Sequence, residues 1–349
     1  MNSKERVLAA FEFRRPDRIP RFDGFWEYPD SWAERFGPRE DQTDISIWVP
    51  DEGVFPSRVR VLEETAEHTI RVDSWGRTVR RHRGAHFDEV LAVPIPDGVD
   101  PDTVQFDPPD LPLRFERGQS ETVGSRDLAR DKARFCVFGK TGGPFLRTSF
   151  VRGETQFLMD MAGDPPLARA LVDKLADHFI GIARAQIERW CLQETGVWIY
   201  DDMAMNQGPM FSPASFEQVL LPAYRRMVRE YRAAGARYVM FHSDGNILPV
   251  LDMLVDAGID GINPMERRAG MDPATIRARH PRLILTGGIC NVETLPHGPA
   301  ERIEREAREL IDMGRDGGVV IGPHSIGPDV PIDNYAVYRR TCLQYGVLA

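Results

Sequence analysis

The chain has few cysteines and no long apolar run. Its four cysteines are widely spaced and form no CxxC pair: Cys136, Cys191, Cys290 and Cys342. This scarcity argues against a disulfide framework and against a thiolate zinc knuckle. None of the apolar runs approaches the roughly 20 residues that span a bilayer, and residues 1–6 lack the apolar core of a signal peptide. We therefore expect a cytoplasmic protein with reduced thiols and no membrane partner.

The charge is too evenly distributed for a nucleic-acid-binding surface. The net charge of −9 is spread along 349 residues, so no nucleic-acid partner is expected. The basic cluster at residues 77–83 lies on an alternating run typical of a solvated strand face, although it could also meet an anionic substrate. No GxGxxG motif follows the first strand, which disfavours a nucleotide-binding Rossmann unit. With 42% hydrophobic and 28% charged residues, the composition is that of a globular enzyme.

From about residue 133 the chain repeats a short apolar strand, a loop and a helix. The predicted strands cover residues 135–138, 197–200, 238–241, 261–263, 283–285 and 319–321. Helix starts are indicated between them, for example where Ser212 precedes Pro213. This rhythm predicts an α/β fold, a parallel (β/α)8 TIM barrel, in preference to an open doubly wound sheet.

The first 132 residues follow no such rhythm. Ser3 is expected to be the N-cap of an amphipathic helix, an aromatic block covers residues 22–28, and residues 68–93 alternate around a turn at 73–76 like a hairpin. Proline is dense in residues 94–112, as in a connecting loop. We expect residues 1–132 to form an α+β extension that caps the barrel mouth, and residues 133–349 to form the catalytic barrel, as one structural unit.

Two predicted strands lead into histidines. Residues 238–246 read YVMFHSDGN, so His242 and Asp244 follow a buried strand and, two residues apart, can project to one face. His324 follows the strand at 319–321. The carboxyl ends of barrel strands meet at one rim, where such enzymes carry their active sites. Two histidines and a carboxylate there would suffice for a divalent metal or for acid–base chemistry.

Other side chains at this rim could have structural roles instead of functional ones. One of the adjacent Asp201 and Asp202 is expected to cap a loop, Asn263 precedes Pro264 as turn residues often do, and Cys290 could be a small packed residue. In the aromatic block, Trp26 and Glu27 could close over the barrel mouth or could form a hydrophobic staple for the first helix.

Several segments of the chain form a specific set. They are residues 4–10 (KERVLAA) with 15–20 (RPDRIP), Asp201-Asp202 leading to 211–213 (FSP), residues 241–264, and residues 322–331 (GPHSIGPDVP). Together they span essentially the whole chain, and the set resembles the uroporphyrinogen decarboxylase superfamily. The resemblance implies a (β/α)8 barrel with an N-terminal extension over its mouth. That superfamily also includes corrinoid-linked methyltransferases, among them those of the corrinoid:coenzyme M type.

Two departures bear on the branch of the superfamily. Uroporphyrinogen decarboxylases grip substrate carboxylates with an arginine-rich RQAGR-type segment, whereas residues 21–27 here read RFDGFWE, which would repel a polycarboxylate. The methyltransferases hold zinc with a His-x-Cys pair and a later cysteine. Here His242 matches the histidine, Asp244 stands in place of the first cysteine, and His324 falls near the second. His324 also matches a histidine of the decarboxylases and does not discriminate by itself. The acidic segment at 21–27 therefore carries the preference for the methyltransferase-like branch over the haem-pathway decarboxylases.

The leading hypothesis is a metal-assisted methyltransferase or demethylase for a small, aromatic or methoxylated substrate. Zn²⁺ or another divalent metal would be held by His242, Asp244 and His324. The expected site residues are Asp202, Glu27, His242 and His324 as catalytic groups, and Trp26, Trp75, Asn263 and Cys290 as substrate contacts. The chain shows no separate cobalamin-binding domain, so any corrinoid would come on a partner protein. A homodimer is compatible with the sequence.

Two other hypotheses remain open. In a metal-free decarboxylase, a carbon–carbon lyase for a small acid, Asp202 would stabilise a cationic intermediate and His324 would handle the proton. In a non-catalytic barrel, the same rim would bind a corrinoid protein or a ligand.

Overall fold

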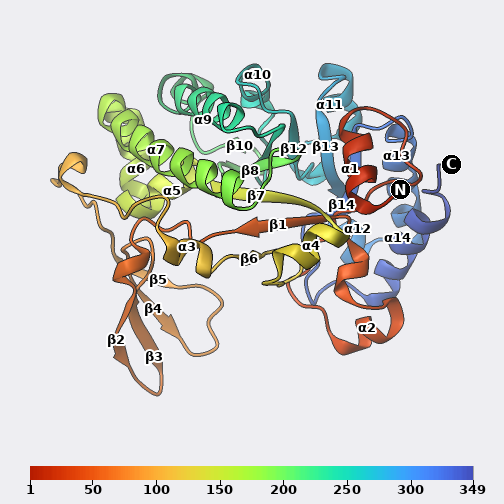
Figure 1. The fold of residues 1–349 in the computed structure, drawn as a ribbon, viewed down its shortest axis with the longest axis horizontal. Coiled ribbons are helices and arrows are strands. Elements are labelled where there is room, and N and C mark those ends of the chain that lie inside the picture. Colours follow the sequence, from red (N-terminus) through yellow and green to blue (C-terminus); the bar gives the residue numbers. More distant parts are fainter. Residues whose placement is uncertain (349) are drawn as a thin grey trace.

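The computed structural model describes residues 1–348, and an eight-stranded sheet forms its centre (Figure 1). In sheet order the strands are β14 (Val319–Pro323), β13 (Ile284–Ile289), β12 (Gly261–Asn263), β11 (Tyr238–His242), β8 (Gly196–Tyr200), β7 (Cys136–Gly142), β1 (Ile45–Val49) and β6 (Gln119–Ser120). Neighbours from β14 to β1 pair in parallel, and the short β6 is antiparallel to β1. Nearly every residue of the parallel strands is buried, as expected of a sheet covered on both faces.

Residues 20–25 close the sheet into a barrel between β14 and β1. Arg21 forms a parallel bridge to Ile321 of β14, and Phe22 forms an antiparallel bridge to Thr43, just before β1. The Phe22 N–H donates to the Ile321 carbonyl (2.9 Å), and the Asp44 N–H donates to the Arg21 carbonyl (2.7 Å). The predicted α/β barrel is thus confirmed, with this segment standing between its first and last parallel strands.

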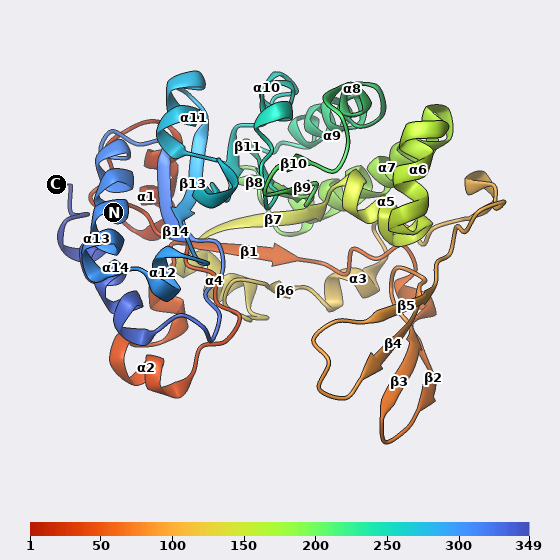
Figure 2. The same cartoon turned by 180° about the vertical axis from the view of Figure 1, so that it is seen from behind.

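Helices surround the barrel (Figures 1 and 2). They are α1 (Ser3–Phe11), α2 (Asp30–Phe36), α3 (Pro112–Glu116), α4 (Leu128–Arg134), α5 (Pro144–Arg152), α6 (Glu154–Gly163), α7 (Pro165–Arg189), α8 (Pro213–Ser215), α9 (Leu221–Ala233), α10 (Leu248–Asp256), α11 (Pro273–Arg279), α12 (Thr294–His297), α13 (Ala300–Met313) and α14 (Ile332–Gln344). Their starts follow local chemistry: Ser212 accepts an N-cap hydrogen bond ahead of Pro213, as the sequence predicts, and Asp272 does the same ahead of Pro273. The N-cap of α1 is Asn2 and not Ser3, because the Asn2 side chain accepts the Glu5 N–H. Within residues 1–348, no helix is both long and apolar enough to cross a membrane.

A second, four-stranded antiparallel sheet projects from the barrel on the β1 side (Figures 1 and 2). It contains β2 (Arg60–Glu64), β3 (His68–Val72), β4 (Thr78–His82) and β5 (Glu89–Ala92), in that order. The predicted hairpin is confirmed, since β3 and β4 pair across a turn in which Asp73 accepts hydrogen bonds from the N–H groups of Trp75 and Arg77. The basic run at 77–83 lies partly on β4, where Arg81 pairs with Asp88 and Arg80 with Glu89.

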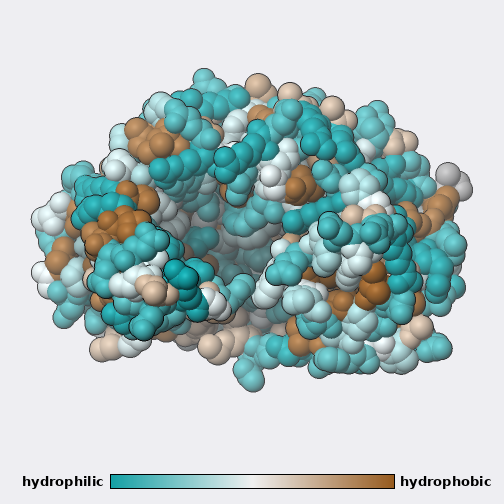
Figure 3. Space-filling view, turned by 90° about the horizontal axis from the view of Figure 1, so that it is seen from below, coloured by the Kyte–Doolittle hydropathy of each residue, from teal (hydrophilic) through white to brown (hydrophobic). Residues whose placement is uncertain are grey.

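The division of the chain near residue 133 stays a prediction, but two elements of the first part belong to the barrel itself. Strand β1 lies within the sheet. Helix α1 covers the amino ends of the strands, opposite to the mouth, because Phe11 packs its ring against Tyr238, the first residue of β11 (centroids 5.1 Å apart). The remaining N-terminal elements include the projecting sheet and α2, which flank the face that is hollowed near its centre in Figure 3.

Asp44 joins these N-terminal pieces to the barrel. Its carboxylate is 1% exposed and accepts hydrogen bonds from Ser3 and Arg6 of α1 (2.8 and 2.9 Å), from Arg18 (2.8 Å), and from the Arg21 N–H (2.9 Å). Burial alone would raise the pKa of Asp44, but the charges and hydrogen bonds of Arg18 and Arg6 lower it. The ionised carboxylate therefore ties α1 and the closing segment to the start of β1.

Replacing Asp44 with asparagine should lower the free energy of unfolding by about 3 kcal/mol at pH 7, because two arginines lose their buried partner. The pKa of Asp44 is lowered in the folded state, so this contribution is present above about pH 4 and is lost as the pH falls through the folded pKa. Urea denaturation at several pH values measures it. Asp41→Asn is the matched control, since Asp41 forms an ion pair with Arg134 at the surface (side chains 50% and 37% exposed); equal losses in the two variants would contradict the role of Asp44.

Candidate active site

Strand register places three functional side chains in one row. His242 pairs in register with Tyr200 of β8 on one side and with Asn263 of β12 on the other. In-register residues of neighbouring strands project to the same face of a sheet. Accordingly, the rings of Tyr200 and His242 stack with centroids 4.1 Å apart and planes 14° apart, and Asn263 Oδ1 lies 2.6 Å from His242 Nδ1.

Asn263 fixes the tautomer of His242. The Asn263 amide donates from Nδ2 to the Thr286 carbonyl (3.1 Å), so its Oδ1 must face the imidazole. An amide oxygen accepts, and therefore His242 Nδ1 carries the proton and donates. The lone pair of Nε2 is then free for another partner.

The candidate metal site consists of His242, Asp244 and His324, whose potential ligand atoms all lie within 4.8 Å of one another. Asp244 Oδ1 is 3.7 Å from His242 Nε2 and 3.3 Å from His324 Nε2. This oxygen is buried and has no hydrogen-bond partner among residues 1–348. The predicted convergence of the three residues is thus confirmed, while their binding of a metal stays a prediction.

Two further carboxylates crowd the candidate metal site. Asp202 Oδ1 lies 3.7 Å from His242 Nε2 and accepts the Asp244 N–H (3.0 Å). Glu266 accepts the Gly245 N–H (2.6 Å). Burial, followed by the charges of Asp202 and Glu266, raises the pKa of Asp244 to about 8. The arrangement concentrates negative charge where a cation would relieve the repulsion.

The two imidazoles stay neutral in this setting. Burial and the neighbouring His324 lower the pKa of His242 to about 4, and burial also lowers the pKa of His324. Neutral imidazole is the form that binds metals. At neutral pH both imidazoles are thus in the metal-binding form, and Asp244 would release its proton when a cation binds.

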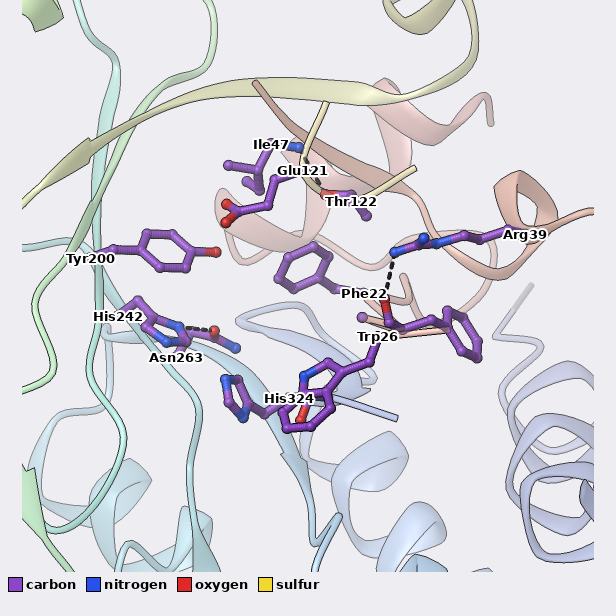
Figure 4. Close-up of a pocket in the computed structure, with 13 residues that line it drawn as sticks. Phe22, Trp26, Arg39, Ile47, Glu121, Thr122, Tyr200, His242, Asn263 and His324 are labelled. Carbon is purple, nitrogen blue, oxygen red and sulfur yellow. Dashed lines mark hydrogen bonds between the residues drawn. The ribbon is translucent and has the colours of Figure 1, made fainter. Parts of the chain in front are cut away.

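A pocket of about 190 Å³ opens beside the histidines (Figure 4). Its lining comprises Phe22, Gly24, Phe25, Trp26, Arg39, Ile47, Glu121, Thr122, Tyr200, His242, Asn263, His324 and Ser325. Drug-sized ligands occupy pockets of roughly 300–1,000 Å³. The space therefore suits a small molecule.

Tyr200 lies between His242 and a charged pair. Lys140 Nζ sits 4.2 Å from the centre of the Tyr200 ring and contacts both carboxylate oxygens of Glu121 (2.8 Å each). Burial alone would raise the pKa of Glu121, but Lys140 lowers it. In Figure 4 the Tyr200 hydroxyl and the Glu121 carboxylate face each other across one end of the pocket.

The structure brings together only some of the residues expected from the sequence. Trp26, Asn263, His242 and His324 line the pocket, and Asp202 adjoins His242. Cys290 lines a small neighbouring cavity that also includes His324 and Glu266. The adjacent Asp201 serves structure, as predicted for one of the two aspartates: it accepts the N–H groups of Phe145 and Leu146 at the start of α5.

Trp75 and Glu27 do not line the pocket. The Trp75 ring packs against Phe150 (centroids 5.5 Å apart) and Phe179, beside α5 and α7, because the tight hairpin turn directs it there. Glu27 is exposed at the surface, one residue beyond Trp26. Their expected roles as a substrate contact and a catalytic group therefore find no support in the geometry.

The sequence did not indicate roles for Arg39, Glu121 and Tyr200, which line the pocket, or for Lys140, which contacts Glu121 and Tyr200. Two of them carried a usable signal. Tyr200 ends a predicted strand, and Lys140 is a charged residue in a strand that is otherwise fully buried. Arg39 and Glu121 come from irregular N-terminal segments, where no periodicity indicates direction.

Comparison with known proteins places the chain among related sequences. The sequence profile of the family described as Uroporphyrinogen decarboxylase (URO-D) matches residues 112–345. A Methylcobamide:CoM methyltransferase MtaA of Methanosarcina barkeri is 24% identical over 339 residues, covering 95% of this chain and 94% of that protein. A Uroporphyrinogen decarboxylase of Mannheimia succiniciproducens is 25% identical over 285 residues, covering 77% and 74%. The solved structure of a methyltransferase from Methanosarcina mazei shares the fold (TM-score 0.65, 19% identity, 99% of each chain).

Replacing Asp244 with asparagine should stabilise the metal-free protein at neutral pH. The folded pKa of Asp244, about 8, exceeds its unfolded value, so the wild-type carboxyl group lowers stability increasingly as the pH rises from about 4 to 8. Because the side chain is 41% exposed, solvent screens the effect, and we expect a gain of about 1 kcal/mol at pH 7. Urea denaturation in the presence of a chelator measures this gain.

The stabilities of wild type and Asp244→Asn should coincide near pH 4 and separate as the pH rises. Asp252→Asn is the control, since Asp252 is an exposed carboxylate paired with Arg279. A pH-independent difference between wild type and Asp244→Asn would show that the carboxyl group titrates normally.

Proposed function

The chain belongs to the uroporphyrinogen decarboxylase family, and on that basis we propose that it catalyses metal-assisted methyl transfer to or from a small molecule. The observation that supports this most is the convergence of His242, Asp244 and His324 around an unpartnered carboxylate oxygen. The similarity to a methylcobamide:CoM methyltransferase over 95% of the chain favours the methyltransferase branch.

The residues present fit a divalent metal. Two neutral imidazole nitrogens and one carboxylate oxygen make a three-ligand set of the kind that leaves a further position open in catalytic zinc sites. His242 is oriented by Asn263, as ligating histidines usually are by a neighbouring acceptor. Asp244 Oδ1 has no hydrogen-bond partner, and the charges of Asp202 and Glu266 act on this carboxyl group. A bound cation would satisfy the oxygen and offset the negative charge. Zn²⁺ or another divalent ion would serve.

The protein's own residues would supply orientation and an enclosed, partly apolar setting. When bound, the metal would act as a Lewis acid toward an acceptor thiol or an ether oxygen. Asp202, beside His242, would position the polar end of the substrate. The rings of Phe22 and Trp26 would hold the carbon skeleton, and Tyr200 would offer a hydroxyl at the wall opposite Trp26. The methyl group would come from, or pass to, a corrinoid on a partner protein.

Pocket size and charge argue against a tetrapyrrole substrate. About 190 Å³ is available, and among the described lining residues the only arginine is Arg39. Recognition of several carboxylates would call for several guanidinium groups. A metal-free decarboxylase of a small acid remains the alternative, in which Asp202 and His324 would act without a cation.

Replacing Asn263 with alanine should weaken binding of Zn²⁺ by about 10- to 100-fold, because the His242 ring loses the partner that fixes its tautomer. Isothermal titration of chelator-treated protein with Zn²⁺ measures this. His242→Ala and Asp244→Ala should lower metal content further, while circular dichroism stays unchanged. Asn291→Ala is the control, since that amide hydrogen-bonds to Ser325 rather than to a histidine. Equal affinity in Asn263→Ala and wild type would refute the orienting role.

Zinc-loaded protein should consume methylcobalamin in the presence of a small thiol such as 2-mercaptoethanesulfonate, or demethylate a methoxylated aromatic compound with cob(I)alamin as acceptor. Absorbance spectroscopy of the corrinoid follows both directions. Loss of the Lewis acid in His242→Ala should slow turnover by at least about 100-fold. Arg237→Gln, at the amino ends of the strands, should leave the rate unchanged. If chelated enzyme instead releases carbon dioxide from small aromatic acids, the lyase alternative replaces this proposal.

A further inference from the structure

Arg39 is a cation at the pocket that lacks an anionic partner. Its Nη2 donates to the Phe25 carbonyl (2.7 Å), and its guanidinium lies 5.9 Å from the centre of the Phe25 ring. Its Nε is buried without a hydrogen-bond acceptor, and within residues 1–348 no carboxylate lies within ion-pair distance of it. The adjacent Glu40 and Asp41 pair instead with Arg130 (3.2 Å) and Arg134 (2.8 Å).

This arrangement is costly unless something else supplies the anion. Burial lowers the pKa of Arg39 and outweighs the opposing charge of Glu40, yet a guanidinium remains charged at neutral pH. A partly desolvated cation with an unsatisfied donor loses hydration that no protein group replaces. Buried arginines elsewhere have partners for their donors: Arg21 pairs with Asp23 (2.7 Å) and Arg152 with Asp160 (2.7 Å), while Arg114 donates to backbone carbonyls, among them those of Asp51 and Pro108 (2.9 Å each).

The other charged groups of the pocket are already committed. Glu121 binds Lys140 through both oxygens, so Lys140 is neutralised. The two histidines are directed toward Asp244. Arg39 is therefore the positive group of the pocket that remains available to a ligand.

The position of Arg39 makes the two ends of the pocket chemically different. In Figure 4, Arg39 lies on the far side of the pocket from Tyr200 and His242, with the rings of Phe22 and Trp26 between. A ligand would thus meet a cation at one end, aromatic surface in the middle and the candidate metal site at the other end.

We propose that the pocket binds a small molecule with one anionic group, a carboxylate, sulfonate or phosphonate, that pairs with Arg39. Its apolar middle packs against Phe22 and Trp26, and its methyl-donating or methyl-accepting end faces His242 and His324. The assignment of the reacting end rests on the proposed function, whereas the assignment of the anionic end does not. One guanidinium in about 190 Å³ selects a monoanion over a polycarboxylate.

Pairs of ligands that differ only in their charged group test whether the pocket recognises an anion. 4-Methoxybenzoate and 4-methoxybenzamide have nearly the same shape and differ in charge, and 3-methoxypropanoate and 3-methoxypropanamide form the corresponding aliphatic pair. Calorimetric titration of wild type should show each carboxylate binding more tightly than its amide. The aromatic pair should bind more tightly than the aliphatic pair if the rings of Phe22 and Trp26 hold the ligand.

Arg39→Gln should weaken carboxylate binding by about 10- to 100-fold, the range expected when a hydrogen bond to a charged group is lost, and should leave amide binding unchanged. Arg39→Lys should retain part of the preference for the carboxylate. Arg35→Gln is the matched control, because it removes the same charge four residues away, where Arg35 pairs with Asp333. That variant should bind like wild type.

The proposal is overturned if carboxylates and amides bind wild type equally, if Arg39→Gln leaves the preference intact, or if neither carboxylate binds at millimolar concentration. The comparison of probes on wild type does not depend on the folding of any variant. Running each titration on chelated and on zinc-loaded protein separates this proposal from the methyl-transfer proposal. Arg39-dependent binding in a protein that takes up no metal would support anion binding at Arg39 and refute metal-assisted methyl transfer.

Discussion

Parallel pairing of β8, β11 and β12 in one register is the constraint on which the site depends. The register sets Tyr200, His242 and Asn263 side by side, and the buried Thr286 carbonyl of β13 then orients the Asn263 amide. A shift of one residue in any of these strands would turn the row to the other face of the sheet. The precision of the site thus derives from backbone hydrogen bonds of the barrel, while the loops contribute Asp244, Asp202 and His324.

The charged groups of the rim lower the stability of the metal-free protein and favour binding of a cation. Burial, followed by the charges of Asp202 and Glu266, raises the pKa of Asp244, and burial lowers the pKa of both His242 and His324. Groups held in such unfavourable ionisation states are typical of functional sites. The barrel tolerates this arrangement because its large apolar core lies below the rim and is independent of it.

The sequence predicts the barrel and the candidate metal site because both follow from simple patterns. Apolar strands that alternate with helices indicate a parallel barrel, and the rule that strand ends meet at one rim joins His242 and Asp244 to the distant His324. The closing segment at 20–25 has no strand-like pattern, so its place in the sheet could not be read. For the same reason the sequence misplaced Trp75: its position depends on how the hairpin packs against α5 and α7, which is a tertiary effect.

The closing segment also contacts both ends of the pocket, at Arg39 and at His324. Ile326 lies two residues beyond His324 and pairs with this segment. Its carbonyl accepts the Trp26 N–H (3.1 Å), and its N–H donates to the Gly24 carbonyl (2.7 Å). Gly24 approaches so closely that a Cβ there would lie 2.7 Å from the His324 carbonyl oxygen. The Phe25 carbonyl between them accepts the hydrogen bond from Arg39. A displacement of residues 24–26 would therefore move the hydrogen-bond acceptor of Arg39 and the backbone beside His324 together.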